Sequence, residues 1–281
     1  MAFRKIRTEG GMMKTKKVDA FFVFKIIICV ILLLYCVLLY VPLIWGVFTS
    51  FKTSGEFRLN AFGFPEKFTL QNYMQAFRLL YVDVSRGVGV TVRVRLIHMF
   101  GYSILYAGGC GLIATATACF MAYAVAKFSK FYMSKVIYMI VLVAMVTPIV
   151  GNLPSEIQVA RTLGLFDTMW GIWIMKMSFL GMYFLVMVNI YLPLAKFTFF
   201  TILLLNFITF WNDYQVPLIY IPSYPTVAYG IFTYSNSNLT DNSNVPSQIT
   251  GSIIMIVPIL ILFLVFHKRL IGNVSMGGIK E

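Results

Sequence analysis

The stretch FKIIICVILLLYCVLLYVPLIWGVF, residues 24–48, is the part of the sequence that decides the fold. Lys25 is its single charged residue. A helix needs about 20 mostly apolar residues to cross the hydrocarbon core of a bilayer. Backbone groups in lipid must also bond to one another, which a helix achieves. The stretch is too long for a signal peptide and lacks a small-residue cleavage site, so it predicts a membrane span.

The rest of the chain has the same character. Of its 281 residues, 59% are hydrophobic and 12% are charged, whereas soluble domains average about 45–50% and about 25%. We therefore predict an all-α integral membrane protein with six transmembrane helices. The predicted division is a basic tail at 1–23, a six-span domain at 24–272 and a C-terminal tail at 273–281, with spans near 24–48, 100–126, 134–152, 168–190, 197–220 and 250–268.

Lysine and arginine are enriched in the cytoplasmic loops of membrane proteins, which predicts the orientation. The first 17 residues carry six basic side chains, and the connection at 221–249 carries none. Both termini are therefore expected on the cytoplasmic side. The external segment between the first two spans, 49–99, runs against this bias, because it holds Lys52, Arg58, Lys67, Arg78, Arg86, Arg93 and Arg95. The bias of the other loops outweighs it.

Several function classes are disfavoured by what the sequence lacks. No basic cluster is interleaved with aromatic residues in a polar domain, as nucleic-acid binding would require. The four cysteines lie in apolar segments without a CxxC spacing, and neither histidine has metal-ligand neighbours. No GxxxxGK[ST] loop, catalytic triad or carboxylate pair is present, so we expect neither an ATPase nor another enzyme.

Two charged residues lie well away from the ends of predicted spans, where charge is costly and often functional. Lys176 in IWIMKMSFL and Asp213 in FWNDY lie at similar depths of adjacent antiparallel spans. One hypothesis is an intramembrane ion pair between them. The alternative is that Lys176 snorkels outward and Asp213 only caps a helix end.

Two further patterns concern packing. In FPEKFTLQNYMQAF, residues 64–77, Thr69 is expected to cap an amphipathic helix with Leu70, Tyr73, Met74 and Phe77 facing inward. Small residues in YAGGCGLIATATACFMAYA, residues 106–124, allow close approach of another helix, either of this chain or of a partner.

Six motifs in one order carry a family resemblance: VPLIWGVFTSFKTSGEF (41–57), FPEKFTLQNYMQAF (64–77), AYAVAKF (122–128), GLFDTMWGIW (164–173), FWNDYQVPLIY (210–220) and LIGNVSMGGIKE (270–281). Together they resemble the permease subunits of binding-protein-dependent carbohydrate ABC importers, of the maltose-type second permease family. The resemblance runs from about residue 26 to the end.

The resemblance implies a subunit of a sugar importer in the bacterial inner membrane, forming part of the translocation path. Its implied partners are a second permease, an external solute-binding protein and an ATPase dimer that holds ATP and Mg²⁺, with no cofactor on this chain. Trp211, Asn212 and Asp213 match a run near the external end of the path, where Trp stacks on sugars and Asn and Asp bond hydroxyls. Met145 and Thr147 would line the same cavity. For all five residues, helix packing is the alternative.

The sequence differs from the family in the coupling loop. Members carry Glu-Ala-Ala in a cytoplasmic loop that docks on the ATPase, and this sequence lacks it between Asn189 and Pro193. Docking through KFSKFYMSK, residues 127–135, is one alternative, although a headgroup anchor explains that basic, aromatic segment more simply. The rival function is therefore a coupling-deficient permease-like protein that assembles with partners without ATP-driven transport.

Overall fold

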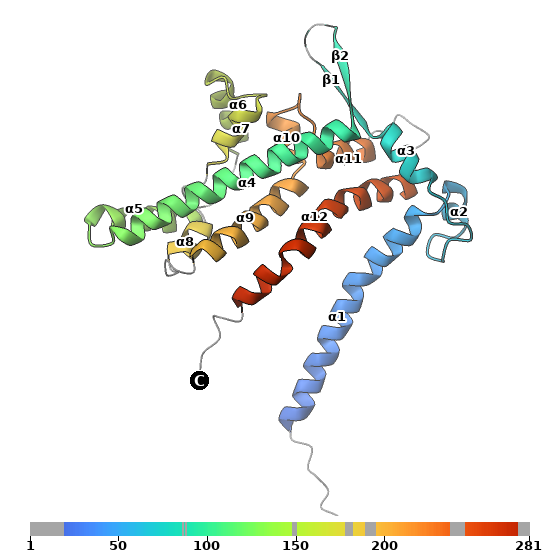
Figure 1. Cartoon of the computed structure of the whole chain (residues 1–281), viewed down its shortest axis with the longest axis horizontal. Helices are drawn as coiled ribbons and strands as arrows, with labels where there is room; N and C mark the ends of the chain where they lie inside the picture. The colour runs from blue at the N-terminus through green and yellow to red at the C-terminus, as the bar shows by residue number, and fades with distance from the viewer. Residues whose placement is uncertain are drawn as a thin grey trace, which may run out of the picture. The chain divides into compact units, whose positions relative to one another are not determined.

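The computed structural model describes residues 20–85, 87, 89–147, 151–177, 182–188, 195–236 and 245–274. Most of them are helical (Figure 1). The elements in chain order are α1 Ala20–Ser50, α2 Ser54–Leu59, α3 Gln71–Leu79, β1 Tyr81–Ser85, β2 Thr91–Arg95, α4 Leu96–Lys127, α5 Tyr132–Val146, α6 Leu153–Thr162, α7 Met169–Met175, α8 Met182–Val188, α9 Ala195–Asn212, α10 Gln215–Tyr220, α11 Val227–Asn236 and α12 Val245–Val274.

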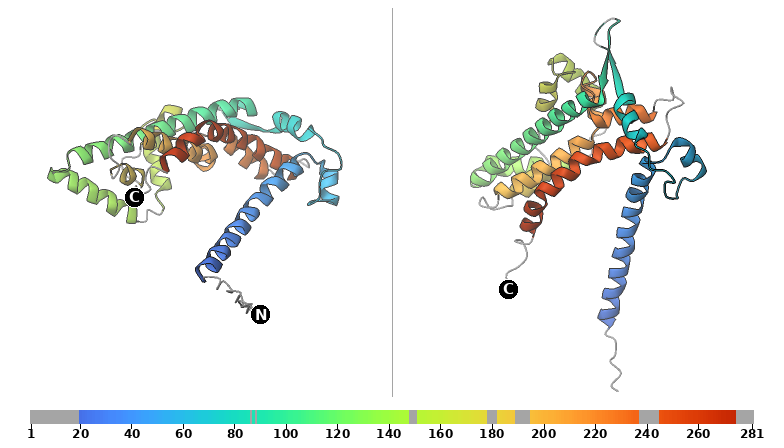
Figure 2. Two further views of the ribbon diagram at one scale, coloured as in Figure 1. Left: turned by 60° about the horizontal axis from the view of Figure 1, so that its bottom comes forward. Right: turned by 45° about the vertical axis from the view of Figure 1, so that its right-hand side comes forward.

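The chain forms two compact units, Met1–Trp45 and Gly46–Glu281. The first unit contains most of α1, whose apolar side chains are exposed along its length. In the second unit α4 is the central helix and contacts α5, α7, α8, α9 and α11. Helix α9 lies between α4 and α12, as both views of Figure 2 show. This arrangement brings segments that are about a hundred residues apart in sequence to the same place.

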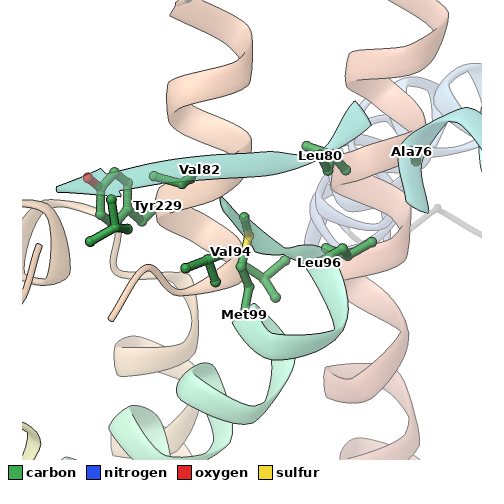
Figure 3. Packing of buried hydrophobic residues seen from close by; sticks show 9 residues of the cluster. Ala76, Leu80, Val82, Val94, Leu96, Met99 and Tyr229 are labelled. Carbon is green, nitrogen blue, oxygen red and sulfur yellow. The ribbon is translucent and has the colours of Figure 1, made fainter. Parts of the chain in front are cut away.

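A β-hairpin corrects the all-α expectation. Strands β1 and β2 pair antiparallel, with Val82 opposite Val94. Valines alternate with polar residues along both strands, and Gly87 and Gly89 have the positive φ angles, 109° and 80°, that a tight connection needs. Alternation gives the hairpin one apolar face. That face packs in a buried cluster with Met99 and with Tyr229 of α11 (Figure 3).

Three helices are long and apolar enough to cross a membrane: Phe22–Ser50, Leu96–Lys127 and Val245–Phe266. Two shorter apolar helices, Tyr132–Val146 and Thr198–Asn212, lie within the expected spans 134–152 and 197–220. Helix α5 ends one residue before Thr147, which precedes a proline and so disfavours helical backbone. The number of crossings and the side of the termini remain predictions.

The expected continuous helices at 168–190 and 197–220 are both divided. The first range holds α7 and α8, which are separate short helices. The second ends its long helix at Asn212 and restarts at Gln215 as α10. A charged residue lies at each break: Lys176 is the C-cap of α7, and Asp213 lies between α9 and α10. Both breaks therefore place polar groups where a continuous helix was predicted.

The inward face of α3 also differs from the expectation. Thr69 does accept a hydrogen bond from the Gln71 backbone, at 3.2 Å, as a cap would. The buried residues of the helix are Asn72 and Ala76, however, while Leu70, Met74 and Phe77 are exposed. Tyr73 is half-buried, and its hydroxyl lies 2.8 Å from Ser50 Oγ.

Candidate functional site

Asp213 occupies the break between α9 and α10 and is the centre of the candidate site. Its Oδ1 accepts the backbone N–H of Val216 at 3.1 Å, which satisfies one free donor in the first turn of α10. Its Oδ2 accepts the hydroxyl of Tyr106 at 2.8 Å. Tyr106 is fully buried on α4, 107 residues earlier in the chain. The carboxylate thus fixes the junction of three helices, and it is itself only half-buried.

The predicted Lys176–Asp213 ion pair is not formed as a direct contact. In the described part of the chain, the ion pair within 4.0 Å is Arg93–Asp83 on the hairpin. The observed role of Asp213, capping the start of α10, is close to the alternative of a helix-capping residue.

Trp211 is packed rather than presented to a ligand. Its side chain is 2% exposed, and its Nε1 donates to the carbonyl of Met255 on α12 at 3.1 Å. Its ring stacks on Phe207 at a centroid distance of 5.7 Å and contacts Phe100 at 6.1 Å. These contacts favour the packing alternative for Trp211. Asn212 is exposed, and its amide donates to Ile208 of its own helix at 2.9 Å.

Met145 and Thr147 lie at the C-terminal end of α5, and both side chains are exposed on the surface of the chain. Thr147 Oγ1 donates to Val143 of the same helix at 2.8 Å. Within the described residues, no hydrogen bond or ring contact joins either side chain to Asp213. Asn189 and Pro193, which flank the missing coupling loop, lie outside the described residues.

Two acidic residues that the sequence pattern did not single out form hydrogen bonds with α10 and the loop after it. One lies on α6 and the other in the loop between α6 and α7. Glu156 Oε2 accepts the hydroxyl of Tyr220 at 2.7 Å. Asp167 accepts the backbone N–H of Ser223 at 2.9 Å and its hydroxyl at 2.6 Å. The Asp167 backbone N–H also donates to the carbonyl of Tyr220 at 2.8 Å.

Asp167 is further marked by a left-handed backbone, with φ of 56°. Few non-glycine residues adopt this conformation, and Asp tolerates it better than most. It belongs to GLFDTMW, a motif that carried the family resemblance without suggesting a role for this carboxylate. The geometry assigns it one, as the clamp between two connections of the chain.

The small residues of α4 face α9 of the same chain. A Cβ at Gly111 would lie 3.3 Å from the Phe207 backbone nitrogen and 3.4 Å from its Cα. One turn further along, Asn206 Nδ2 donates to Thr115 Oγ1 at 2.9 Å, and both side chains are buried. The expected close helix contact is thus present, within this subunit, between α4 and α9 (Figure 1), and the bond from Tyr106 to Asp213 also joins these helices.

The chemistry available at the site is hydrogen bonding. Carboxylate, amide and phenol groups gather where α4, α9 and α10 meet, and these groups bind hydroxyls. No group of three or more His, Cys, Asp or Glu side chains among the described residues is placed to hold a metal ion.

Comparison with known proteins shows similarity along most of the chain. The diacetylchitobiose uptake system permease protein NgcG of Streptomyces coelicolor is 22% identical, over 88% of this chain and 86% of its own length. The multiple sugar-binding transport system permease protein MsmG of Streptococcus mutans is 25% identical, over 96% of this chain and all of its own. No family model matches the chain.

A solved structure shares the fold. A chain of a bacterial ABC transporter that imports the acidic polysaccharide alginate superposes with a TM-score of 0.60 at 20% identity, covering 88% of this chain and 96% of that one. The resemblance predicted from the six motifs is therefore confirmed by relatives and by fold. The chain is a multi-pass membrane protein, with three described helices long and apolar enough to cross a bilayer.

Proposed function

We propose that this chain, a transport subunit that resembles the permeases of sugar ABC importers along most of its length, forms part of the path by which a sugar or oligosaccharide crosses the bacterial inner membrane. The observation that carries the proposal is near end-to-end similarity to sugar-uptake permeases, 96% of this chain against all of MsmG. The names of the relatives refer to diacetylchitobiose and to multiple sugars, which favours a carbohydrate cargo without selecting one.

The proposed assembly follows from being a permease component of an ABC importer. We expect a second permease to complete the path, an external solute-binding protein to deliver the sugar, and an ATPase dimer to bind ATP and Mg²⁺. This chain would hydrolyse nothing itself.

Within the path, Asn212 and Asp213 are the proposed contacts for sugar hydroxyls. Asn212 is exposed and uses one amide donor within its helix, so its amide oxygen and second donor remain for a ligand. Asp213 is half-buried beside it, with its carboxylate held by the hydroxyl of Tyr106 and the backbone N–H of Val216. Trp211 supports both residues through its buried packing on α12.

The test is reconstitution in liposomes with a second permease, ATPase and binding protein taken from neighbouring genes. We expect ATP hydrolysis to rise when sugar-loaded binding protein is added, and to require this chain. An ATPase with its phosphate-loop lysine replaced is the control. If the ATPase fails to co-purify with the permease pair, coupled transport is ruled out in favour of the coupling-deficient alternative.

A further inference from the structure

Helix α3 exposes a stripe of apolar side chains and buries a polar one, which is unusual for a helix on the surface of a soluble protein. Its polar residue Asn72 is 4% exposed. The apolar residues Leu70, Met74 and Phe77 recur at the spacing of one helix face and are 62%, 58% and 53% exposed. An outward apolar stripe over an inward amide indicates a non-aqueous surrounding for this helix.

The inward contacts of α3 show that this orientation is built in. Asn72 Nδ2 donates to the carbonyls of Ser50, at 2.8 Å, and Lys52, at 2.7 Å. Ala76 and the following Leu80 lie in the cluster that also holds the hairpin valines (Figure 3). Rotating the helix to bury its apolar stripe would break both sets of contacts.

The loop before α3 extends the same apolar surface. Leu59, the last residue of α2, and Phe62, Phe64 and Phe68 of the loop are 92%, 87%, 73% and 69% exposed. The loop is held from beneath by Lys52, which is fully buried and whose Nζ donates to the carbonyls of Asn60 at 2.7 Å and Ala61 at 3.4 Å. These side chains are exposed on a backbone that the rest of the unit holds in place.

The position of α3 relative to two of the candidate spans indicates what surrounds this helix. The span Phe22–Ser50 ends at Ser50, whose carbonyl Asn72 binds. Leu80 Cδ1 lies 3.4 Å from where a Cβ of Gly251 would stand. Gly251 is six residues inside the span that begins at Val245, or ~9 Å at 1.5 Å per residue. The α3 segment therefore lies at the level of a membrane boundary.

We propose that this surface, formed by Leu59, Phe62, Phe64, Phe68, Leu70, Met74 and Phe77, is a membrane-interface anchor that lies in the headgroup and upper acyl region of the bilayer. Interfacial helices bury an apolar face there and place basic side chains among the headgroups. Arg58, Lys67 and Arg78 are exposed in the same segment and outnumber its two glutamates, Glu56 and Glu66. The anchor is independent of the proposed transport function.

Nitroxide scanning of the full chain in phospholipid vesicles tests this anchor. In a background with Cys29, Cys36, Cys110 and Cys119 replaced by serine, single spin labels are introduced through Met74→Cys and Phe77→Cys. Gln75→Cys is the matched control. Gln75 is also exposed and lies between Met74 and Phe77 in sequence, but it is on a different face of the helix. Collision with oxygen, which enters lipid, is compared with collision with a polar nickel chelate, which stays in water.

We expect the ratio of oxygen to nickel accessibility to be several-fold higher at 74 and 77 than at 75. Equal ratios at the three positions would overturn the anchor, because the surface would then face water. Low accessibility to both reagents at 74 and 77 would also overturn it, because another protein surface would then cover the helix. Met74, Gln75 and Phe77 are exposed, whereas Cys110 of the background is buried, so monodisperse behaviour in detergent is checked for the cysteine-free parent as well as for the three variants.

Discussion

At the scale of single residues, the bond from Tyr106 to Asp213 is the longest-range polar contact at the candidate site. A hydrogen bond to a charged acceptor is stronger than one between neutral groups, and its loss leaves the acceptor underbonded. Tyr106→Phe removes the donor and keeps the ring that packs edge-on to Phe210. We expect a loss of about 1–3 kcal/mol in the free energy of unfolding, measured by thermal or chemical denaturation in detergent.

Tyr102→Phe is the control for that change. Tyr102 lies one turn earlier on α4, and its ring packs edge-on to Tyr224 in the same way. The described residues give its hydroxyl no hydrogen bond, so this variant should unfold like the parent. Equal destabilisation of the two variants would contradict the assignment.

Asn212 provides a second prediction at this scale. Asn212→Ala should lower the stimulation of ATP hydrolysis by sugar-loaded binding protein about tenfold, the effect of losing about 1.4 kcal/mol of ligand hydrogen bonding. Asn236→Ala is its counterpart, because Asn236 is also exposed and also donates to a carbonyl four residues earlier, at 2.9 Å. A drop in stimulation that is the same in both variants would argue against a role for Asn212 in the path.

Residue roles were predictable from the sequence only where a local signal existed. The importance of Asp213 was visible because a carboxylate in an apolar run is unusual. Its partner was not, since Tyr106 is one of 16 tyrosines and carries no local mark. Trp211 was expected to face a sugar or a neighbouring helix, and burial against α12, a segment 44 residues further along, points to the second. Such outcomes depend on tertiary contacts that no local pattern contains.

At the scale of elements, the contact of α4 with α9 depends on the absence of side chains. Gly111→Leu should force the helices apart, because even a Cβ there would press on the Phe207 backbone. Overpacking of this kind costs about 1–3 kcal/mol. Gly108→Leu is the control on the same helix, since a Cβ at Gly108 meets nothing within 4 Å. The measurement is the unfolding temperature in detergent, and an undisturbed Gly111 variant would contradict the packing described.

Some helices and strands could be predicted from the hydrophobic pattern of the sequence, and others could not. Long apolar runs predicted α1, α4 and α12, because length and composition alone distinguish a span. Lys176 and Asp213 were predicted to lie within continuous helices. A polar residue can also stand where a helix ends, when neighbouring groups form hydrogen bonds with it. The hairpin was missed, even though Val82, Val84, Val92 and Val94 alternate with polar residues, because the segment was treated as loop.

At the scale of the whole molecule, the predicted orientation is open to direct labelling. Thr91→Cys on the hairpin should react with a membrane-impermeant maleimide in intact cells, because the external segment is expected outside. Lys130→Cys, in the exposed turn after α4, should react only after permeabilisation. Both sites are exposed, so a difference in reactivity reports the side of the membrane. The reverse labelling pattern would invert the topology.

The resemblance to sugar ABC permeases was the most predictable feature, since six ordered motifs carried it without any contact information. The connection to an ATPase was the least predictable, because the Glu-Ala-Ala loop that the family resemblance implies is absent between Asn189 and Pro193. Coupling depends on a contact between chains, and a single sequence holds only one side of that contact.

The burial of Lys52 has a consequence for how the chain is made. Among the described residues of the predicted external segment, the ammonium of Lys52 donates to two backbone carbonyls, and Arg93 is paired with Asp83 at 3.1 Å. None of these partners is in place while the nascent segment is being inserted. In the predicted orientation the segment crosses the membrane before Lys52 has these partners, and we expect the six basic residues before α1 to hold the N-terminus inside.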